Sequence, residues 1–132
     1  MKYLLDSNIC IHFFRGKEEV FHRINDCKST DFAISEITYL ELLYGAECSS
    51  NPSKNKNIVL DFVSKIQVLP ISEILELFAK EKFKLRKLGT PISDFDLLIA
   101  STSVKYKLIM VTENTSEFQR VSKIKLENWV SR

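Results

Sequence analysis

Three acidic side chains stand where a folded chain rarely places a charge without a reason. Asp6 directly follows the strand-like run Tyr3-Leu4-Leu5, and Asp96 lies three residues after Ser93, at the start of an expected helix. Glu41 lies inside a helical segment that is apolar on nearly every side, and no Lys or Arg lies within one turn of it. A buried carboxylate is costly unless it is paired or bound to a metal. Glu41 therefore needs a partner from elsewhere in the fold.

The other polar residues of this set also have purely structural interpretations. Asp6, taken alone, is explained as the N-cap of the helix that follows it. The run from Ser93 to Asp96 fits the S-x-x-D capping box, which would give Asp96 a structural role. Asn114 follows a later strand-like run, where it suits ordinary turn chemistry. Glu41 is harder to explain in this way.

The chemistry of the set follows from where parallel strands end. Residues at the carboxyl ends of such strands, and at the starts of the following helices, meet at one edge of the sheet. Asp6, Glu41 and Asp96, joined there by Asn114, would repel one another and resist ionising, so a cation is the simplest partner. Oxygen ligands without His or Cys favour Mg²⁺ or Mn²⁺ over zinc. Such an ion activates water and neutralises phosphate, which predicts metal-dependent cleavage of a phosphodiester.

The elements that must position these residues alternate between short strand-like runs and longer helical ones. Alternation of this kind favours a three-layer α/β/α sandwich with a mostly parallel central sheet. Ser35 and Ser72 are expected to cap helices, and residues 51–53 are expected to form a loop. The predicted strands are residues 3–5, 32–34, 66–70, 108–111 and 124–126, and the predicted helices are residues 9–15, 18–27, 36–48, a stretch around 58–63, 72–88 and 93–106.

Length and composition narrow the class of protein. A chain of 132 residues with 45% hydrophobic residues suits one domain spanning residues 1–132. A formal charge of +2 is too small to predict nucleic-acid binding from bulk charge. The longest apolar runs have four residues, so no membrane span is expected. Cys10, Cys27 and Cys48 lack metal-ligand spacing, which indicates a reducing, cytoplasmic compartment and three small buried hydrophobes.

Four segments, in order and at fitting spacing, resemble the motifs of PIN-domain ribonucleases. They are residues 4–8 (LLDSN), 35–46, 95–100 (FDLLIA) and 111–118 (VTENTSEF), and the ending at 124–129 is similar to that of the VapC toxin branch. The likeness spans the whole chain. It implies a PIN-like fold and the toxin of a type II toxin–antitoxin pair, which cuts RNA with Mg²⁺ or Mn²⁺. Initiator tRNA, cut in its anticodon stem-loop, is one candidate substrate that the resemblance implies.

The resemblance also assigns roles to residues of this sequence. It implies that Asp6, Glu41 and Asp96 are catalytic metal ligands and that Asn114 holds the fourth catalytic position, where many relatives have Asp. Because Asn114 is neutral, occupancy of a second metal site stays open. By the same resemblance, the hydroxyls of Ser7 and Thr112 lie near the site and orient carboxylates or waters. Three further acids lie nearby but match no motif position: Asp94, Glu113 and Glu117.

Partners follow partly from the resemblance and partly from local charge. The resemblance implies a homodimer within larger toxin–antitoxin complexes, and an antitoxin that threads through a groove among the helices. A segment of that antitoxin would place Arg or Lys near the acids. RNA phosphates have candidate contacts in basic residues, although a solvated helix face is the commoner meaning of such a run. These candidates are Arg15, Lys80, Lys84, Arg86 and Lys87.

Three alternatives stay open. A PIN fold without catalysis would bind RNA whether or not the acids are intact. The same metal chemistry would also cut DNA, and nothing in the sequence separates the two substrates. A metal-free mechanism would use His12 or His22 as acid and base. That mechanism would leave a 2′,3′-cyclic phosphate, whereas attack by water leaves a 5′-phosphate and a 3′-hydroxyl.

Overall fold

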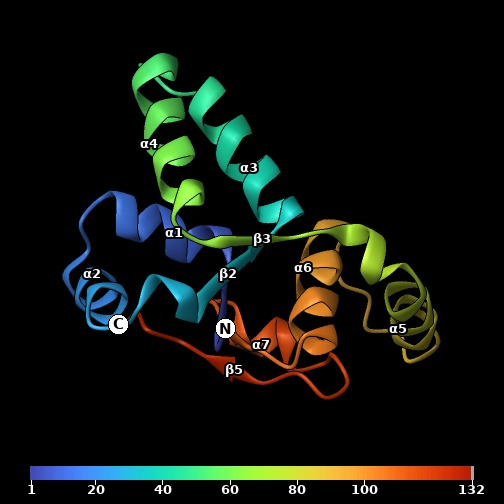
Figure 1. Cartoon of the computed structure of the whole chain (residues 1–132). Coiled ribbons are helices and arrows are strands. Elements are labelled where there is room, and N and C mark those ends of the chain that lie inside the picture. Colours follow the sequence, from blue (N-terminus) through green and yellow to red (C-terminus); the bar gives the residue numbers. More distant parts are fainter. Residues whose placement is uncertain (132) are drawn as a thin grey trace.

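A computed structural model describes residues 1–131 and shows a five-stranded sheet wrapped by helices (Figure 1). Every pair of neighbouring strands in this sheet is parallel, and the strand order is β3-β2-β1-β4-β5. The predicted fifth strand lies slightly later in the chain than residues 124–126. The strands are β1 (Tyr3–Leu5), β2 (Phe32–Ser35), β3 (Gln67–Leu69), β4 (Ile109–Val111) and β5 (Leu126–Glu127).

Helices connect the strands and cover both faces of the sheet (Figure 1). Within residues 1–131, none is long and apolar enough to cross a membrane. Short 3₁₀ turns occupy Ser29–Asp31 and Ile71–Glu73. The α-helices are α1 (Ser7–Phe14), α2 (Glu18–Asn25), α3 (Glu36–Glu47), α4 (Pro52–Ser64), α5 (Leu75–Lys87), α6 (Asp94–Lys105) and α7 (Thr115–Phe118).

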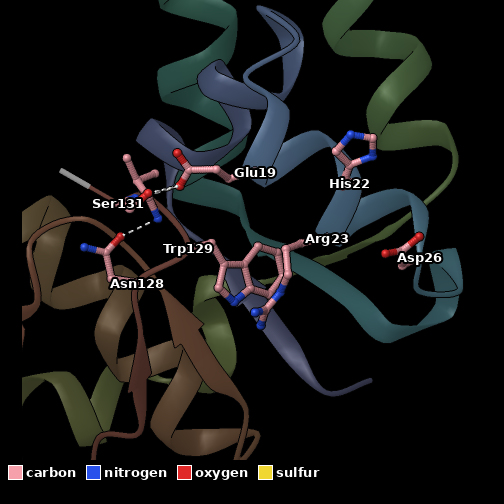
Figure 2. A pocket seen from close by; sticks show the side chains of 8 residues that line it. Glu19, His22, Arg23, Asp26, Asn128, Trp129 and Ser131 are labelled. Carbon is pink, nitrogen blue, oxygen red and sulfur yellow. Dashed lines mark hydrogen bonds between the residues drawn. The ribbon is translucent and has the colours of Figure 1, made fainter.

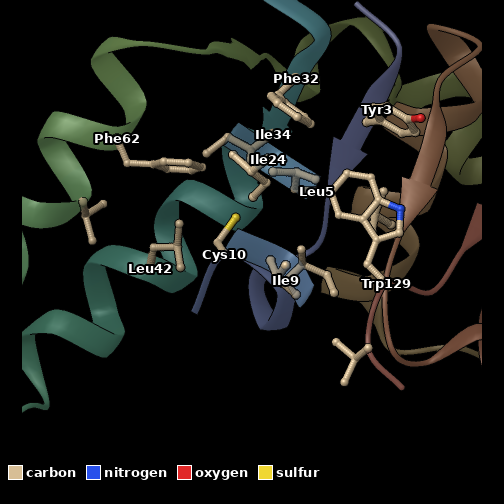
Figure 3. Packing of buried hydrophobic residues seen from close by; sticks show 14 residues of the cluster. Tyr3, Leu5, Ile9, Cys10, Ile24, Phe32, Ile34, Leu42, Phe62 and Trp129 are labelled. Atoms are coloured by element: carbon tan, nitrogen blue, oxygen red, sulfur yellow. The ribbon is translucent and has the colours of Figure 1, made fainter. Parts of the chain in front are cut away.

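The side chains of β1 alternate between two separate cores. Tyr3 and Leu5 face a cluster that includes residues of α1, α2 and α4, and Trp129 packs edge-on against Tyr3 there (Figure 3). Leu4 faces a second cluster formed with α5, α6 and α7. A strand buried on both faces is typical of a parallel sheet covered by two layers of helices. The predicted three-layer α/β/α sandwich is therefore confirmed.

Predicted N-caps define where three helices begin at the carboxyl edge of the sheet. The carboxylate of Asp6 accepts a hydrogen bond from the Ser7 N–H at 2.8 Å at the start of α1. Ser35 Oγ accepts from Ile37 N–H at the start of α3. Ser93 Oγ accepts from Asp96 N–H at the start of α6. These contacts satisfy backbone donors that a helix leaves free, and they place the acids at this edge.

Two helix starts differ from the prediction. Residues 51–53 are not a loop, because α4 begins at Pro52 and Asn51 caps it. Proline has no N–H to lose at the first helical position, so it starts the helix instead of interrupting it. Ser72 does not cap α5 but lies in a 3₁₀ turn, and α5 begins only at Leu75. That turn is held by Glu36, whose Oε1 accepts from the Ile71 N–H at 2.8 Å.

The prediction that α3 is buried on nearly every side is wrong. Leu40 and Tyr44 are 49% and 69% exposed, whereas Ile37, Leu42 and Ala46 are buried. Figure 1 shows why, because α3 and α4 pack as a hairpin that extends beyond the sheet. One face of α3 contacts α4 and the core, and the other is left to solvent. An apolar surface of this kind is typical of an interaction site.

The three cysteines also occupy different environments. Cys10 is buried as predicted, Cys27 is half-buried and Cys48 is exposed. The interpretation of all three as core residues is therefore wrong for Cys48. It follows Glu47, the last residue of α3, where the hairpin has left the core. All three thiols are free of disulfide bonds.

Candidate active site

The strand order of the sheet reverses between β1 and β4. From β1 the chain builds outward through β2 to β3, and it then returns to add β4 and β5 on the other side of β1. Ligands of open parallel sheets bind where the strand order reverses, beyond the carboxyl ends of the strands. Asp6 follows β1 and Thr112 follows β4, and the Asp6 N–H donates to the Val111 carbonyl at 2.9 Å. The first predicted acid thus lies at this reversal.

Asp6 is a buried carboxylate held by polar neighbours. It is 3% exposed, and its Oδ2 accepts a hydrogen bond from Thr112 Oγ1 at 2.7 Å. Asn8 Nδ2 donates to the same oxygen at 3.4 Å. Burial nevertheless raises the pKa of Asp6 above its ordinary value, and the nearby charge of Asp96 raises it further, while bonds from Thr112 and Ser7 lower it. The ionised form is therefore disfavoured in the folded chain.

Glu41 reaches the same region from α3. The residue is half-buried, and its Oε1 atom is buried without a hydrogen-bond partner among residues 1–131. Burial raises the pKa of Glu41, a hydrogen bond from the Ser7 side chain lowers it, and the charges of Asp6 and Asp96 raise it. A buried acceptor oxygen without a donor is destabilising. A cation bound to this oxygen would remove that cost, so the atom suits a metal ligand.

The first turn of α6 supplies two acids with different surroundings. Asp96 is half-buried, and its charge raises the pKa of both Asp6 and Glu41, so these three acids share one electrostatic field. Asp94 is exposed and forms an ion pair with Lys82 of α5 at 2.9 Å. The structure therefore groups Asp96 with the other acids and turns Asp94 toward α5.

The donor set of the three acids suits a hard cation. It offers oxygen atoms only, it brings like charges together, and it leaves the buried Oε1 of Glu41 without a donor. No three Asp, Glu, His or Cys side chains of residues 1–131 are arranged to hold a metal by themselves. Mg²⁺ binds through one or two carboxylates and keeps several waters, so this looser arrangement fits it.

The loop after β4 brings further polar groups close to Asp6. The Asn114 N–H donates to Thr112 Oγ1 at 3.1 Å, and the exposed side chain of Asn114 makes no capping bond to α7. Asn114 therefore takes part in the turn through its backbone N–H, and its side chain is left free of a capping role. Glu113 bonds to His12 of α1, and Glu117 lies in the first turn of α7. Sequence reasoning missed the bond between Glu113 and His12, because 101 residues separate them.

A groove leads from Glu41 along the helices. Its volume is about 330 Å³, and α1, α3 and α4 form its walls. Arg15 lines the groove together with Glu41, so one of the predicted RNA contacts does lie near an acid. A second hollow of about 310 Å³ shares Phe14 and Ile58 with the first. The two hollows therefore adjoin, and they form the kind of groove among helices that the resemblance implies.

The other predicted RNA contacts lie on α5, apart from the α3–α4 hairpin (Figure 1). Lys80 forms an ion pair with Glu76 at 3.1 Å, and Lys84 bonds to Ser122. Lys87 lies over the ring of Phe83 at 5.4 Å. Arg86 forms no ion pair within residues 1–131. Lys80 and Lys87 are thus engaged within their own helix, and Lys84 is engaged by a residue outside it.

A hollow of about 400 Å³ lies elsewhere, between α2 and the C-terminal segment (Figure 2). The guanidinium of Arg23 lies 4.6 Å from the centre of the Trp129 ring, and Glu19 accepts from the backbone and the hydroxyl of Ser131. None of the predicted acids lines this hollow. His22 does line it, and is therefore outside the acid site, so it fits no general acid or base role there.

Comparison with known proteins places this fold and site in a family. The family model described as "PIN domain" matches residues 3–124. The chain is 33% identical over 130 residues to the "tRNA(fMet)-specific endonuclease VapC" of Salmonella typhimurium, and 98% of each chain is covered. It is 36% identical over 132 residues to "Ribonuclease VapC2" of Haemophilus influenzae, which covers 98% of this chain and 99% of that one.

A solved structure supports the same family assignment as these sequence comparisons. The crystal structure of DNA-bound VapBC from Salmonella typhimurium matches with a TM-score of 0.91 at 35% identity, over 98% of this chain and 99% of that one. This chain therefore belongs to the PIN-domain family and, within it, to the VapC ribonucleases. The resemblance seen in the four sequence motifs is confirmed.

Proposed function

We propose that this chain is the toxin of a type II toxin–antitoxin pair, a metal-dependent endoribonuclease with one nuclease domain over residues 1–132 that acts in the cytoplasm. One observation carries the proposal. Glu41 buries a carboxylate oxygen without a donor, and it shares one electrostatic field with Asp6 and Asp96 at the reversal of the sheet. A structural role does not explain three acids that destabilise one another, whereas a cation site does.

The side chains divide the work of such a site. Asp6, Glu41 and Asp96 would hold Mg²⁺ or Mn²⁺, directly or through water. When bound, the ion neutralises phosphate charge and makes water a better nucleophile. Thr112 fixes the orientation of Asp6 through its 2.7 Å hydrogen bond, and Ser7 does the same for Glu41.

The chemical ends of the products follow from water as the nucleophile. Asn114 presents an exposed amide beside Thr112 and would help to position the attacking water. Water attacks phosphorus, and the bond to the 3′-oxygen breaks. The products then carry a 5′-phosphate and a 3′-hydroxyl. His12 and His22 take no part as acid or base in this mechanism.

The substrate and the antitoxin follow from the relatives and the grooves. Curated relatives in Salmonella typhimurium and Shigella flexneri are named tRNA(fMet)-specific endonucleases, which supports initiator tRNA, cut in the anticodon stem-loop, as the substrate of this chain. The adjoining grooves would receive a segment of the antitoxin. A basic side chain of that segment, next to Glu41, would compete with the cation and silence the enzyme.

The same family likeness supports a homodimer that assembles with antitoxin into larger complexes. Exposed apolar side chains on two helices offer surface for that assembly. Leu40 and Tyr44 of α3 are exposed, as is Phe83 of α5. Apolar surface of this kind is more stable when a partner covers it.

Cleavage of RNA by the purified protein tests the proposal. Total bacterial RNA and initiator tRNA are incubated with Mg²⁺, Mn²⁺ or EDTA, and Asp6→Asn is the control for contaminating nuclease. We expect discrete fragments with 5′-phosphate ends, which disappear with EDTA and in the variant. Equal cleavage by both proteins, or RNA binding without cleavage, would support a non-catalytic module. Fragments of DNA alone would redirect the substrate, and 2′,3′-cyclic ends would contradict the mechanism and implicate the histidines.

A further inference from the structure

A side-chain contact joins α1 to the loop that follows β4. His12 Nε2 lies within hydrogen-bond distance of Glu113 Oε1, although 101 residues separate the two along the chain. A carboxylate can only accept a hydrogen bond, so the histidine nitrogen is the donor. The side chains are 26% and 12% exposed, so both lie largely out of solvent. The sequence motifs assigned a role to neither residue.

The contact closes a ring of bonds around Asp6. Asp6 caps α1, which carries His12 one and a half turns later. On the other side, Asp6 Oδ2 accepts from Thr112 Oγ1, and Thr112 immediately precedes Glu113. The Thr112 hydroxyl also receives the N–H of Asn114. The residues that bracket Glu113 are therefore the two whose placement matters to the acid site.

We propose that His12 and Glu113 are positioning residues, which hold the loop of Thr112 and Asn114 against Asp6 for phosphodiester cleavage. The inference rests on the function proposed above. Without the contact, the Thr112 hydroxyl would remain as a side-chain bond between the loop and Asp6, the cap of α1. A threonine hydroxyl rotates freely unless its surroundings fix it, so the orientation of Asp6 would then be poorly defined.

A positioning role and a purely stabilising one can be separated within this chain, because water screens an exposed pair, which adds little to the free energy of unfolding. A second pair of the same types, His22 and Glu18, is 3.7 Å apart and is 65% and 87% exposed. That pair lies within α2 and touches no part of the acid site. It provides a matched control inside the same chain.

Two readouts test the proposal, starting with turnover. His12→Ala and Glu113→Ala are each expected to lower kcat roughly 10- to 100-fold, with little change in KM for RNA or in Tm. The double variant should lose no more than either single one, because both remove the same contact. His12→Gln keeps a donor and the side-chain volume and should recover most of the activity. His22→Ala should match the wild type.

The second readout does not depend on activity. Hydrogen exchange of the Asn114 amide should be faster in His12→Ala than in the wild type, and unchanged in His22→Ala. A wild type without ribonuclease activity would refute the proposed function, yet this exchange would still test the contact. Wild-type kcat and exchange in both His12→Ala and Glu113→Ala would overturn the inference. Multiplicative losses in the double variant would also overturn it. If the alanine variants unfold, wild-type kcat in Glu113→Val, which keeps the volume without the acceptor, gives the same contradiction.

Discussion

The acids at the carboxyl edge of the sheet and the basic residues of α5 differ in the burial and the pairing of their charges. Asp6 is buried, and Glu41 and Asp96 are half-buried. Burial raises the pKa of Asp6 and of Glu41, and the charge of Asp96 raises both further. On α5, Lys80 and Lys82 are exposed, and each has a carboxylate partner about 3 Å away. The sheet edge thus holds like charges that are shielded from water, whereas α5 holds exposed charges that are paired with opposite ones.

This difference in burial and pairing separates charges that the fold tolerates at little cost from charges that destabilise it. Exposed and paired charges cost the fold little, so they are compatible with solubility alone. Like charges gathered at buried positions are destabilising, and such a cluster is typical of a site where an ion binds or a reaction takes place. The comparison therefore supports the proposed active site at the sheet edge, and it predicts at most an accessory role for α5 in binding RNA.

Replacement of Asp6 should give the largest effect on activity without a loss of stability. Asp6→Asn removes the charge but keeps an acceptor for Thr112, so cleavage should fall by about 10²- to 10³-fold or more. Because burial disfavours the ionised carboxylate, the Tm should stay constant or rise. Cleavage assays and calorimetry on one preparation check both parts. A large drop in Tm would mean that Asp6 is chiefly a helix cap.

Neutralising Glu41 should change how stability depends on pH. The pKa of Glu41 is raised above its ordinary value of 4.5, so the folded chain binds this proton more tightly than the unfolded chain. Stability is therefore greatest below that ordinary value and is lost as the pH rises through the folded pKa. Glu41→Gln should flatten this decline and abolish cleavage. Urea titrations between about pH 4 and pH 8 measure it. An unchanged slope would show that Glu41 is solvated.

Arg15 should have a smaller effect, confined to binding. It lines the groove that contains Glu41, so its guanidinium would lie close to an RNA phosphate if RNA binds at the acids. Arg15→Ala should raise KM while kcat stays constant, and the salt dependence of RNA binding should fall by about one unit of slope. Binding curves at several salt concentrations check this. An unchanged slope would exclude a phosphate contact at this position.

The smallest effects are expected on α5. Lys80 is already paired with Glu76, whereas Arg86 and Lys87 form no ion pair within the described residues. Lys80→Ala should leave RNA affinity unchanged, and a double alanine substitution at Arg86 and Lys87 should weaken it only slightly. The same salt titrations separate the two variants. If Lys80→Ala had an effect as large as that of Arg15→Ala, the contrast between the two regions would fail.

The sequence predicted the acid site because its signals are local. A short apolar strand followed by Asp6, and a carboxylate within the apolar α3, are both visible over a few residues. The order of the elements was equally local, because the strands and the capped helices each carry their own pattern. These signals predict the alternating fold, which the structure confirms, and they mark Asp6, Glu41 and Asp96 as candidates for the site.

The features that were missed depend on distant parts of the chain. Leu40 and Tyr44 are as apolar as their neighbours, and only the position of α4 leaves them exposed. The bond between His12 and Glu113 has no counterpart in local spacing. Asp94 and Asp96 are chemically identical, and packing of α6 against α5 separates their environments. No periodicity in the sequence carries this information.

Two aspartates on one turn of α6 allow the most direct test. Asp96→Asn and Asp94→Asn remove the same charge two residues apart, one inside the shared field of the acids and one in an exposed ion pair with Lys82. Cleavage of initiator tRNA with Mn²⁺ is measured for both. We predict that Asp96→Asn abolishes cleavage while Asp94→Asn cuts at the wild-type rate. Equal rates in the two variants would contradict the assignment of the sheet edge as the active site.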